Sequence, residues 1–327
     1  MITPPTSPLS LTRVPLHQPL LWLAALMAGA SIAATIGLAI DPRLVTGAPL
    51  WAKPLKFSLS IALYALTLSW LLGMLHSHRR LTWWLGTLSA LFLAVEIVII
   101  GGAAALGTTS HFNVSTPLTT TLWSVMAVSI VIVWSAAIAV AILLWRQKLP
   151  DRARAVAIRS GLIIGLVGMG VAFFMTSPNA EQLNDFQGIA GAHTVGLPDG
   201  GAGLPLLGWS TLAGDLRVPH FIGMHALQIL PLSALVLELL GRRFDTLLLP
   251  AVRLRIVVII ATLYGSITAL LTVQALSGQS IVRPDGATIA VTSVLFAGAA
   301  AAIAVSLIAR LPSSREDSAA RVGARTQ

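Results

Sequence analysis

The sequence contains no cysteine and few charged residues. None of its 327 residues is Cys, so disulfide bonds, thiolate metal sites and covalently attached c-type haem are excluded. Asp, Glu, Lys and Arg together make up 10% of the chain, whereas soluble globular proteins carry about 25%. Because this deficit extends along the whole length, it indicates that most of the chain is surrounded by a medium other than water.

Long apolar segments account for the deficit in charge. The hydrocarbon core of a bilayer is about 30 Å thick, and a helix needs about 20 apolar residues to cross it. The alternating ten-residue patterns of membrane barrels are absent. The sequence therefore predicts an all-α polytopic membrane bundle with about eight transmembrane helices in a single domain, residues 19–310. The eight apolar segments are residues 19–40, 55–75, 82–106, 119–145, 158–176, 219–240, 256–276 and 288–309.

The remaining segments are two termini, short connections and one long loop. Residues 1–18, rich in proline and small polar residues, are expected to form a flexible N-terminal segment, and residues 311–327 a disordered tail. Loops as long as residues 177–218 are usually functional or disordered. This loop carries leucines, aromatics and spaced glycines. We therefore expect it to be ordered and to fold as a lid over the helix ends.

Basic residues are unequally distributed between the two sides of the predicted bundle. The chain has 21 Lys and Arg residues and a net charge of +9. Of these, 16 fall on the side that holds both termini, so the positive-inside rule places the N- and C-termini in the cytoplasm. The excess of basic residues is then explained by the membrane topology. The expected partner is the lipid bilayer rather than nucleic acid. The five basic residues on the other side are Arg43, Lys53, Lys56, Arg217 and Arg283.

Unusual polar side chains gather on the extracytoplasmic side of this topology. They include four histidines, and several lie at or just inside the predicted helix ends. This clustering follows from the charge bias alone and is the main functional signal in the sequence. The residues concerned are Lys53, Lys56, Glu96, His111, Asn113, His193, Asp199, Asp215, Arg217, His220, His225 and Gln228.

The histidines His111, His193, His220 and His225 are candidate ligands of a haem or a transition metal. His220 and His225 are five residues apart, about 140° around a helix, so they do not form an i, i+4 metal pair. Each can instead join a loop histidine, and imidazole suits both haem and transition metals. The leading hypothesis is an extracytoplasmic metal or haem site with potential redox activity. The simpler alternative is a set of hydrogen-bonded interfacial histidines.

Two lysines stand at the wrong end of a helix. In the segment WAKPLKF, Pro54 suits the first helical turn. Lys53 and Lys56 then lie at the helix N-terminus, where the macrodipole already presents positive charge. A bound anion, lipid phosphate or an internal carboxylate can compensate for this placement. Glu96, costly within a membrane, is a candidate carboxylate, and we predict a pair between Lys56 and Glu96.

These charged residues support a second hypothesis about function. Lys53, Lys56, Glu96 and Arg217 are suited to surround an anion, which favours a transporter or binding protein for a small anionic solute. A third hypothesis is a structural or assembly protein in which buried polar groups only fix helix packing. The sequence does not decide among the three, and it does not predict an oligomeric state.

Two further features are predicted to serve packing. Gly161, Gly165 and Gly168 have the spacing of small residues that lets membrane helices approach closely. Glu238 lies four residues before Arg242, which favours an ion pair between them along one helix.

Several segments resemble a family of bacterial multi-pass membrane proteins. They are Trp-Ala-Lys-Pro-Leu-Lys-Phe at 51–57, Ser-His-Phe-Asn at 110–113, and Leu-Gly-Trp-Ser at 207–210. The resemblance covers most of the chain and implies a location in the bacterial cytoplasmic membrane, without implying an activity. In the family, a glutamine and an arginine precede Ser-His-Phe-Asn. Ala103 and Leu106 hold those places here, so a role that needs that arginine is in doubt.

Overall fold

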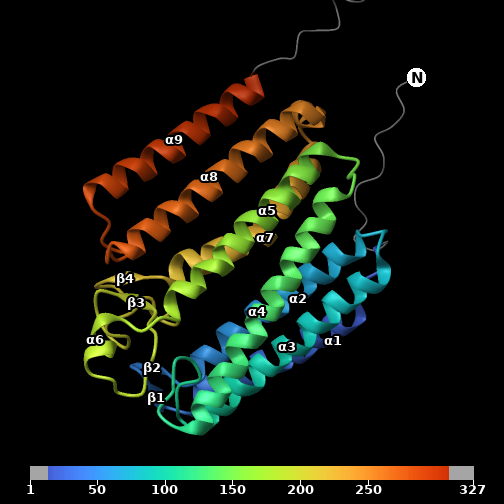
Figure 1. Ribbon diagram of the computed structural model, residues 1–327. Helices are drawn as coiled ribbons and strands as arrows, with labels where there is room; N and C mark the ends of the chain where they lie inside the picture. Colours follow the sequence, from blue (N-terminus) through green and yellow to red (C-terminus); the bar gives the residue numbers. More distant parts are fainter. Residues whose placement is uncertain (1–13, 309–327) are drawn as a thin grey trace, which may run out of the picture.

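The structure is a computed structural model that describes residues 14–308 and is mostly helical (Figure 1). Within these residues, eight helices are long and apolar enough to cross a membrane. This confirms the predicted all-α polytopic membrane bundle. Residues 1–13 and 309–327, on which most of the two terminal predictions fall, lie outside the described part. The spanning helices are α1 (Gln18–Ile40), α2 (Ala52–Gly73), α3 (Arg79–Ala105), α4 (Pro117–Arg146), α5 (Arg152–Val171), α7 (Arg217–Leu240), α8 (Pro250–Leu276) and α9 (Gly286–Ile308).

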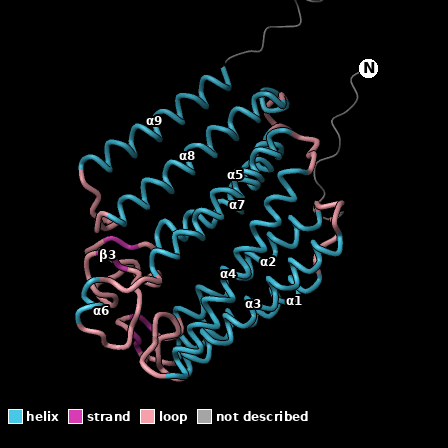
Figure 2. The backbone as a smooth tube through the Cα atoms, in the orientation of Figure 1, coloured by secondary structure: helices cyan, strands magenta, loops and turns pink. Residues whose placement is uncertain are grey.

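The helices form two groups that lie side by side (Figure 1, Figure 2). Helices α1, α2, α3 and α4 pack against one another, and α5, α7 and α8 make a second group with α9 at its edge. Packing of α4 against α5 joins the groups, and there the indole of Trp134 donates to the Leu166 carbonyl oxygen at 3.1 Å. The largest core cluster fills the first group and includes Leu20, Met27 and Leu71.

Helices α5 and α7 approach each other along a line of glycines. A Cβ atom added to Gly168 would lie 2.4 Å from the carbonyl carbon of Gly223, and one added to Gly161 would lie 2.8 Å from the Ala226 carbonyl oxygen. Only glycine permits such backbone contact. The predicted packing role is therefore confirmed for Gly161 and Gly168, whereas a Cβ atom added to Gly165 would meet its neighbours at ordinary contact distances of 3.5 Å or more.

Short elements and loops gather at one end of the bundle, which we call the lid face. The lid, residues 177–218, contains α6 (Ala180–Asn184), β3 (Thr194–Val195) and β4 (Gly214–Asp215), and its last two residues begin α7. Strands β3 and β4 pair antiparallel, with Thr194 opposite Asp215. Also at this end are β1 (Leu44–Val45), its antiparallel partner β2 (Ala48–Pro49), and the short 3-10 helix η2 (Ala172–Met175) that ends α5.

The loop between α3 and α4 holds the lid in place. Asn113 forms an isolated bridge with Ile189. The backbone N–H of Val114 donates to the Gly188 carbonyl at 2.8 Å, and that of Ala190 donates to the Phe112 carbonyl at 2.8 Å. The lid is therefore bonded to the rest of the chain through its backbone.

The opposite face is held by ion pairs between helices. Glu238 of α7 pairs with Arg154 of α5, and Arg253 of α8 lies 3.3 Å from Asp151, the N-cap of α5. The predicted pair between Glu238 and Arg242 is wrong, because the Glu238 carboxylate accepts both of its side-chain hydrogen bonds from Arg154. A 3-10 helix, η3 (Asp245–Leu248), connects α7 to α8 on this face.

Candidate functional site

A cavity of about 730 Å³ lies between the lid and the ends of α2, α3 and α7. This volume is within the range of small-molecule sites, about 300–1,000 Å³. Helix α3 contributes apolar wall residues, Ile100 and Ala104, and α2 contributes Phe57. We call it the lid cavity. Its polar and charged lining includes Lys53, Lys56, Ser110, His111, His193, Asp199 and Arg217.

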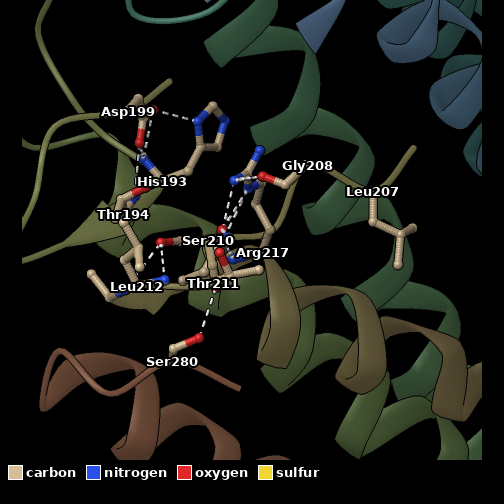
Figure 3. Close-up of polar contacts among 12 residues, drawn as sticks. His193, Thr194, Asp199, Leu207, Gly208, Ser210, Thr211, Leu212, Arg217 and Ser280 are labelled. Atoms are coloured by element: carbon tan, nitrogen blue, oxygen red, sulfur yellow. Dashed lines mark hydrogen bonds and ion pairs between the residues drawn. The ribbon is translucent and has the colours of Figure 1, made fainter. Parts of the chain in front are cut away.

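Arg217 is fixed in the cavity wall by a buried carboxylate. Asp215 is 2% exposed and accepts hydrogen bonds from Arg217 Nε at 2.9 Å and Arg217 Nη2 at 2.6 Å. It also accepts the backbone N–H of Ser210 at 2.8 Å, and Arg217 Nη2 donates to the Gly208 carbonyl at 2.5 Å (Figure 3). Among the described residues Nη1 of Arg217 makes no hydrogen bond, so one end of the guanidinium stays free for the cavity.

His193 and Asp199 form a second pair within the lid (Figure 3). His193 Nδ1 lies 2.6 Å from Asp199 Oδ2, and Asp199 also accepts the backbone N–H of Thr194 at 2.8 Å. Burial raises the pKa of Asp199, but the hydrogen bonds from His193 and Thr194 outweigh it and the net pKa is lowered. Burial lowers the pKa of His193. A neutral His193 that donates through Nδ1 therefore presents Nε2 as an acceptor.

The two lysines of α2 are positioned differently from one another. Lys56 Nζ donates to the Leu207 carbonyl of the lid at 2.7 Å. Lys53 Nζ lies 6.0 Å from the centre of the Phe57 ring and has no hydrogen bond or ion pair with any other residue in the range 14–308. The predicted pair between Lys56 and Glu96 does not form. The Lys56 side chain is bonded to the lid and does not extend into the bundle toward Glu96.

Glu96 is buried in α3 without a partner. It is 1% exposed, and neither carboxylate oxygen makes a hydrogen bond within the described part of the chain. A buried polar group normally has at least one partner, so Glu96 stands out among the polar side chains of the bundle.

The histidines predicted as ligands occupy four different settings. His111 lies among aromatic rings, 5.5 Å from Phe57 and 5.4 Å from Trp123 between ring centres. Its Nδ1 lies 3.1 Å from Ser110 Oγ, and burial is the main cause that lowers its pKa. The ring of His193 faces Asp199, as described above. His111 and His193 both line the lid cavity.

His220 and His225 use Nδ1 to donate to backbone carbonyls of the bundle. His220 bonds to the Gly168 carbonyl at 2.8 Å. His225 bonds to the Phe221 carbonyl at 2.8 Å, and its ring stacks on Phe221 at 4.2 Å. No group of three or more His, Asp or Glu residues within 14–308 is arranged to hold a metal ion. The metal or haem site therefore stays a prediction.

Two other predicted site residues make local or interhelical bonds. Asn113 Oδ1 accepts the hydroxyl of Ser115 at 2.7 Å and its backbone N–H at 3.2 Å, which shapes the loop that carries the lid. Gln228 Nε2 donates to Thr67 Oγ1 of α2 at 3.2 Å and so links the two helix groups. Neither residue belongs to the lining of the lid cavity in the described structure.

Sequence reasoning missed the backbone acceptors and the aromatic wall. The carbonyls of Leu207 and Gly208 hold Lys56 and Arg217, and no residue type signals a carbonyl acceptor. Phe57 and Phe112 could have been found, because Phe57 ends the WAKPLKF segment and Phe112 lies within the SHFN segment.

Comparison of this chain with protein-family models, with curated proteins and with solved structures finds no match.

Proposed function

We propose that this membrane protein binds a small anionic solute in the lid cavity, as a transporter or a binding protein. The observation that supports the proposal is a set of positively charged side chains in the cavity lining that still have hydrogen-bond donors without a protein acceptor. They are Lys53 Nζ, the remaining donors of Lys56 Nζ, and Nη1 of Arg217. An ammonium group has three donors, so Lys56 keeps two after its bond to Leu207.

The carboxylates nearby are already engaged, which favours an anion over a cation as the ligand. Asp215 accepts from Arg217 and from the Ser210 backbone, and Asp199 accepts from His193 and Thr194. The other two acidic residues of the lining, Glu181 and Asp185, are exposed at the surface of the lid. Lys53, Lys56 and Arg217 therefore keep donors inside the cavity, while Asp199 and Asp215 have their oxygens engaged by protein groups.

The N-terminus of α2 adds to the positive character of the cavity. Helices α2 and α7 both begin at the lid face, but the first backbone N–H of α7 donates to Asp215, whereas α2 has no side-chain cap. Unsatisfied N–H groups and the macrodipole make such ends suitable for anions. Ala52 and Lys53, in the first turn of α2, both line the cavity.

The volume and chemistry of the lid cavity indicate the class of anion. A cavity of about 730 Å³ accommodates a small organic molecule as well as an inorganic ion. The planar guanidinium of Arg217 and the compact ammonium groups suit carboxylate or phosphate oxygens. Phe57, His111 and Phe112 form an aromatic side to the cavity. A small organic acid or phosphate ester fits this combination.

Thermal unfolding of the purified full-length protein tests the proposal. Succinate, glycerol 3-phosphate and inorganic phosphate serve as probes, with choline as a cationic control. A bound ligand raises the Tm, by an amount that grows with its concentration. We expect at least one of the three anions to raise the Tm at matched ionic strength, while choline does not. A protein stabilised by choline, or by none of the anions, would contradict the proposal.

We further propose that the lid face is extracytoplasmic and that the membrane is the bacterial cytoplasmic membrane. The basic residues that cluster at the opposite end support this orientation. Because the chain has no cysteine, single substitutions can be labelled without background. Leu197→Cys in the lid should react with an impermeant maleimide in intact cells, and Lys148→Cys only after lysis. The reverse pattern would overturn the orientation.

A metal or haem site is the second candidate, and one observation favours it. His111, His193 and His220 each bond to protein groups through Nδ1, which leaves Nε2 free, as in many metal-bound histidines. The missing three-residue cluster within 14–308 makes it secondary to the anion. Visible absorbance and elemental analysis of the purified protein separate the two, since a Soret band or stoichiometric metal supports this candidate.

A further inference from the structure

The carboxylate of Glu96 is the least satisfied charged group in the described bundle. Its exposure is 1%, and both oxygens are without hydrogen-bond partners in the range 14–308. An ionised carboxylate in this setting is costly. Glu96 therefore needs either a proton or a cation that can reach it, and ionisable residues within membrane spans commonly serve function rather than packing.

Few titratable or charged side chains belong to the elements packed against α3. Helix α1 has none between Gln18 and Ile40, and α4 has one at its far end. The others lie on α2, in the segments next to α1 and α3, or at the start of α3 itself. They include Lys53, Lys56 and Tyr64 on α2, His111 in the loop after α3, Arg146 at the far end of α4, His17 against the first half of α3, Asp41 and Arg43 at its last residue, and Arg79 and Arg80 at its start.

Burial is the largest electrostatic influence on Glu96, and Lys53 is the charged side chain with a Coulombic interaction with it. The two do not form an ion pair within the described structure, and Lys53 instead lines the lid cavity. Lys56 is held away from the bundle by the Leu207 carbonyl at 2.7 Å. Lys53 is therefore the cation that can serve both the cavity and Glu96.

Glu96 lies next to the cavity along α3, on the side away from the lid. Residues four apart share one face of a helix, and Ile100 and Ala104 follow Glu96 at this spacing. Both line the lid cavity. The backbone of Glu96 is thus about one helical turn, roughly 5–6 Å along α3, from that of Ile100 in the cavity lining.

We propose that Glu96 is a proton-binding site coupled to the lid cavity through Lys53, so that one proton is taken up when the anion binds. This inference rests on the proposed function. An anion in the cavity attracts the Lys53 ammonium, and Glu96 then takes a proton from water that enters through the cavity. When the anion leaves, Lys53 turns toward Glu96 and the proton returns to water. No covalent bond other than the O–H bond of the carboxyl group forms or breaks.

The coupling has a consequence for affinity and for transport. Because proton and anion favour each other, lower pH strengthens anion binding and the anion strengthens proton binding, by the same factor. Together they add no net charge when the anion is monovalent. If the cavity opens alternately to the two sides of the membrane, a protein with this coupling moves a proton together with the anion.

Isothermal titration calorimetry measures the proton directly. The probe is whichever of succinate, glycerol 3-phosphate and inorganic phosphate raises the Tm most. Titrations in buffers of different ionisation enthalpy give the number of protons taken up per anion. We expect about one proton for the wild type, close to none for Glu96→Gln, and an unchanged value for the control Asp245→Asn, whose residue is exposed in η3 on the opposite face.

The outcomes separate this inference from the proposed function. If no probe binds, the proposed function fails. Binding with no proton uptake by the wild type, or with equal uptake by Glu96→Gln, overturns the inference and leaves anion binding intact. Should Glu96→Gln fail to fold, infrared difference spectra of the wild type decide instead. Addition of the anion should then produce the carbonyl band of a protonated carboxylic acid, and its absence overturns the inference.

Discussion

The pair between Asp215 and Arg217 offers a sharp test of how the cavity is built. The Asp215 side chain is 0% exposed and that of Arg217 is 27% exposed, and the carboxylate also accepts the backbone N–H groups of Arg217 and Ser210. Substitution of Asp215→Asn removes the charge and one acceptor while the shape is kept. The guanidinium is then left in the cavity wall without its counter-charge.

The expected loss follows from this burial. Removal of one partner from a fully buried pair costs about 3–5 kcal/mol, and the partial exposure of Arg217 reduces the expected loss to roughly 2–3 kcal/mol. With an unfolding entropy of about 2.1 cal/mol/K per residue, this corresponds to a Tm lower by roughly 3–4 °C for a chain of 327 residues. Thermal unfolding in detergent measures it, with the exposed Asp185→Asn as a control that should change stability by less than about 0.5 kcal/mol.

A double-mutant cycle with Arg217→Gln completes the test. Because the two side chains act as a unit, Asp215→Asn combined with Arg217→Gln should cost less than the sum of the single changes by about 1 kcal/mol or more. Additive losses would refute the view that Asp215 serves to position Arg217.

Two further predictions concern pH and packing. Burial lowers the pKa of His111. Below the ordinary imidazole value of about 6.5, the unfolded chain therefore binds more protons than the folded one, and the free energy of unfolding should decrease as the pH is lowered. Thermal scans should show a weaker fall in His111→Gln, and an identical fall would contradict the assignment. Gly168→Ala should cost about 1–3 kcal/mol because its Cβ meets Gly223. Gly170→Ala, which has no atom within 4 Å of the added Cβ, should be neutral, and equal effects would argue against the close α5–α7 contact.

The helices were predictable because a bilayer imposes length and apolarity on every span. All eight apolar segments correspond to helices, and every helix begins before its apolar segment does, by one residue in α1 and by six residues in α5 and α8. Helix α5 starts at Arg152 and α3 at Arg79, while hydropathy alone suggested residues 158 and 82. Their first turns carry arginines, which a search for apolar runs excludes although the backbone is already helical. The short elements of the lid have no comparable signal.

The site was predictable as a location and not as a set of contacts. Charge bias and helix order brought Lys53, Lys56 and Arg217 to one end of the molecule, and they line one cavity. The pairing of Lys56 with Glu96 was wrong because it assumed that the lysine turns inward. The Lys56 ammonium is instead bonded to the Leu207 carbonyl of the lid. Residue types do not predict the path of a long loop, so this acceptor could not be predicted.

The pairing of Glu238 failed for a similar reason. Spacing along one helix favoured Arg242, but a neighbouring helix presents Arg154 to the same carboxylate. Contacts between helices depend on their rotation about their own axes, which hydropathy does not fix.

The affinity of the lid cavity for an anion in a lysine variant tests the central claim most directly. Equilibrium binding of the stabilising probe should be compared for the wild type, Lys53→Met and Lys148→Met, the last on the opposite face. Loss of one charge-assisted hydrogen bond, about 1.5–3 kcal/mol, should weaken binding roughly 10- to 150-fold in Lys53→Met. Lys148→Met should bind as the wild type does. Equal affinity for the probe in all three proteins would contradict the account.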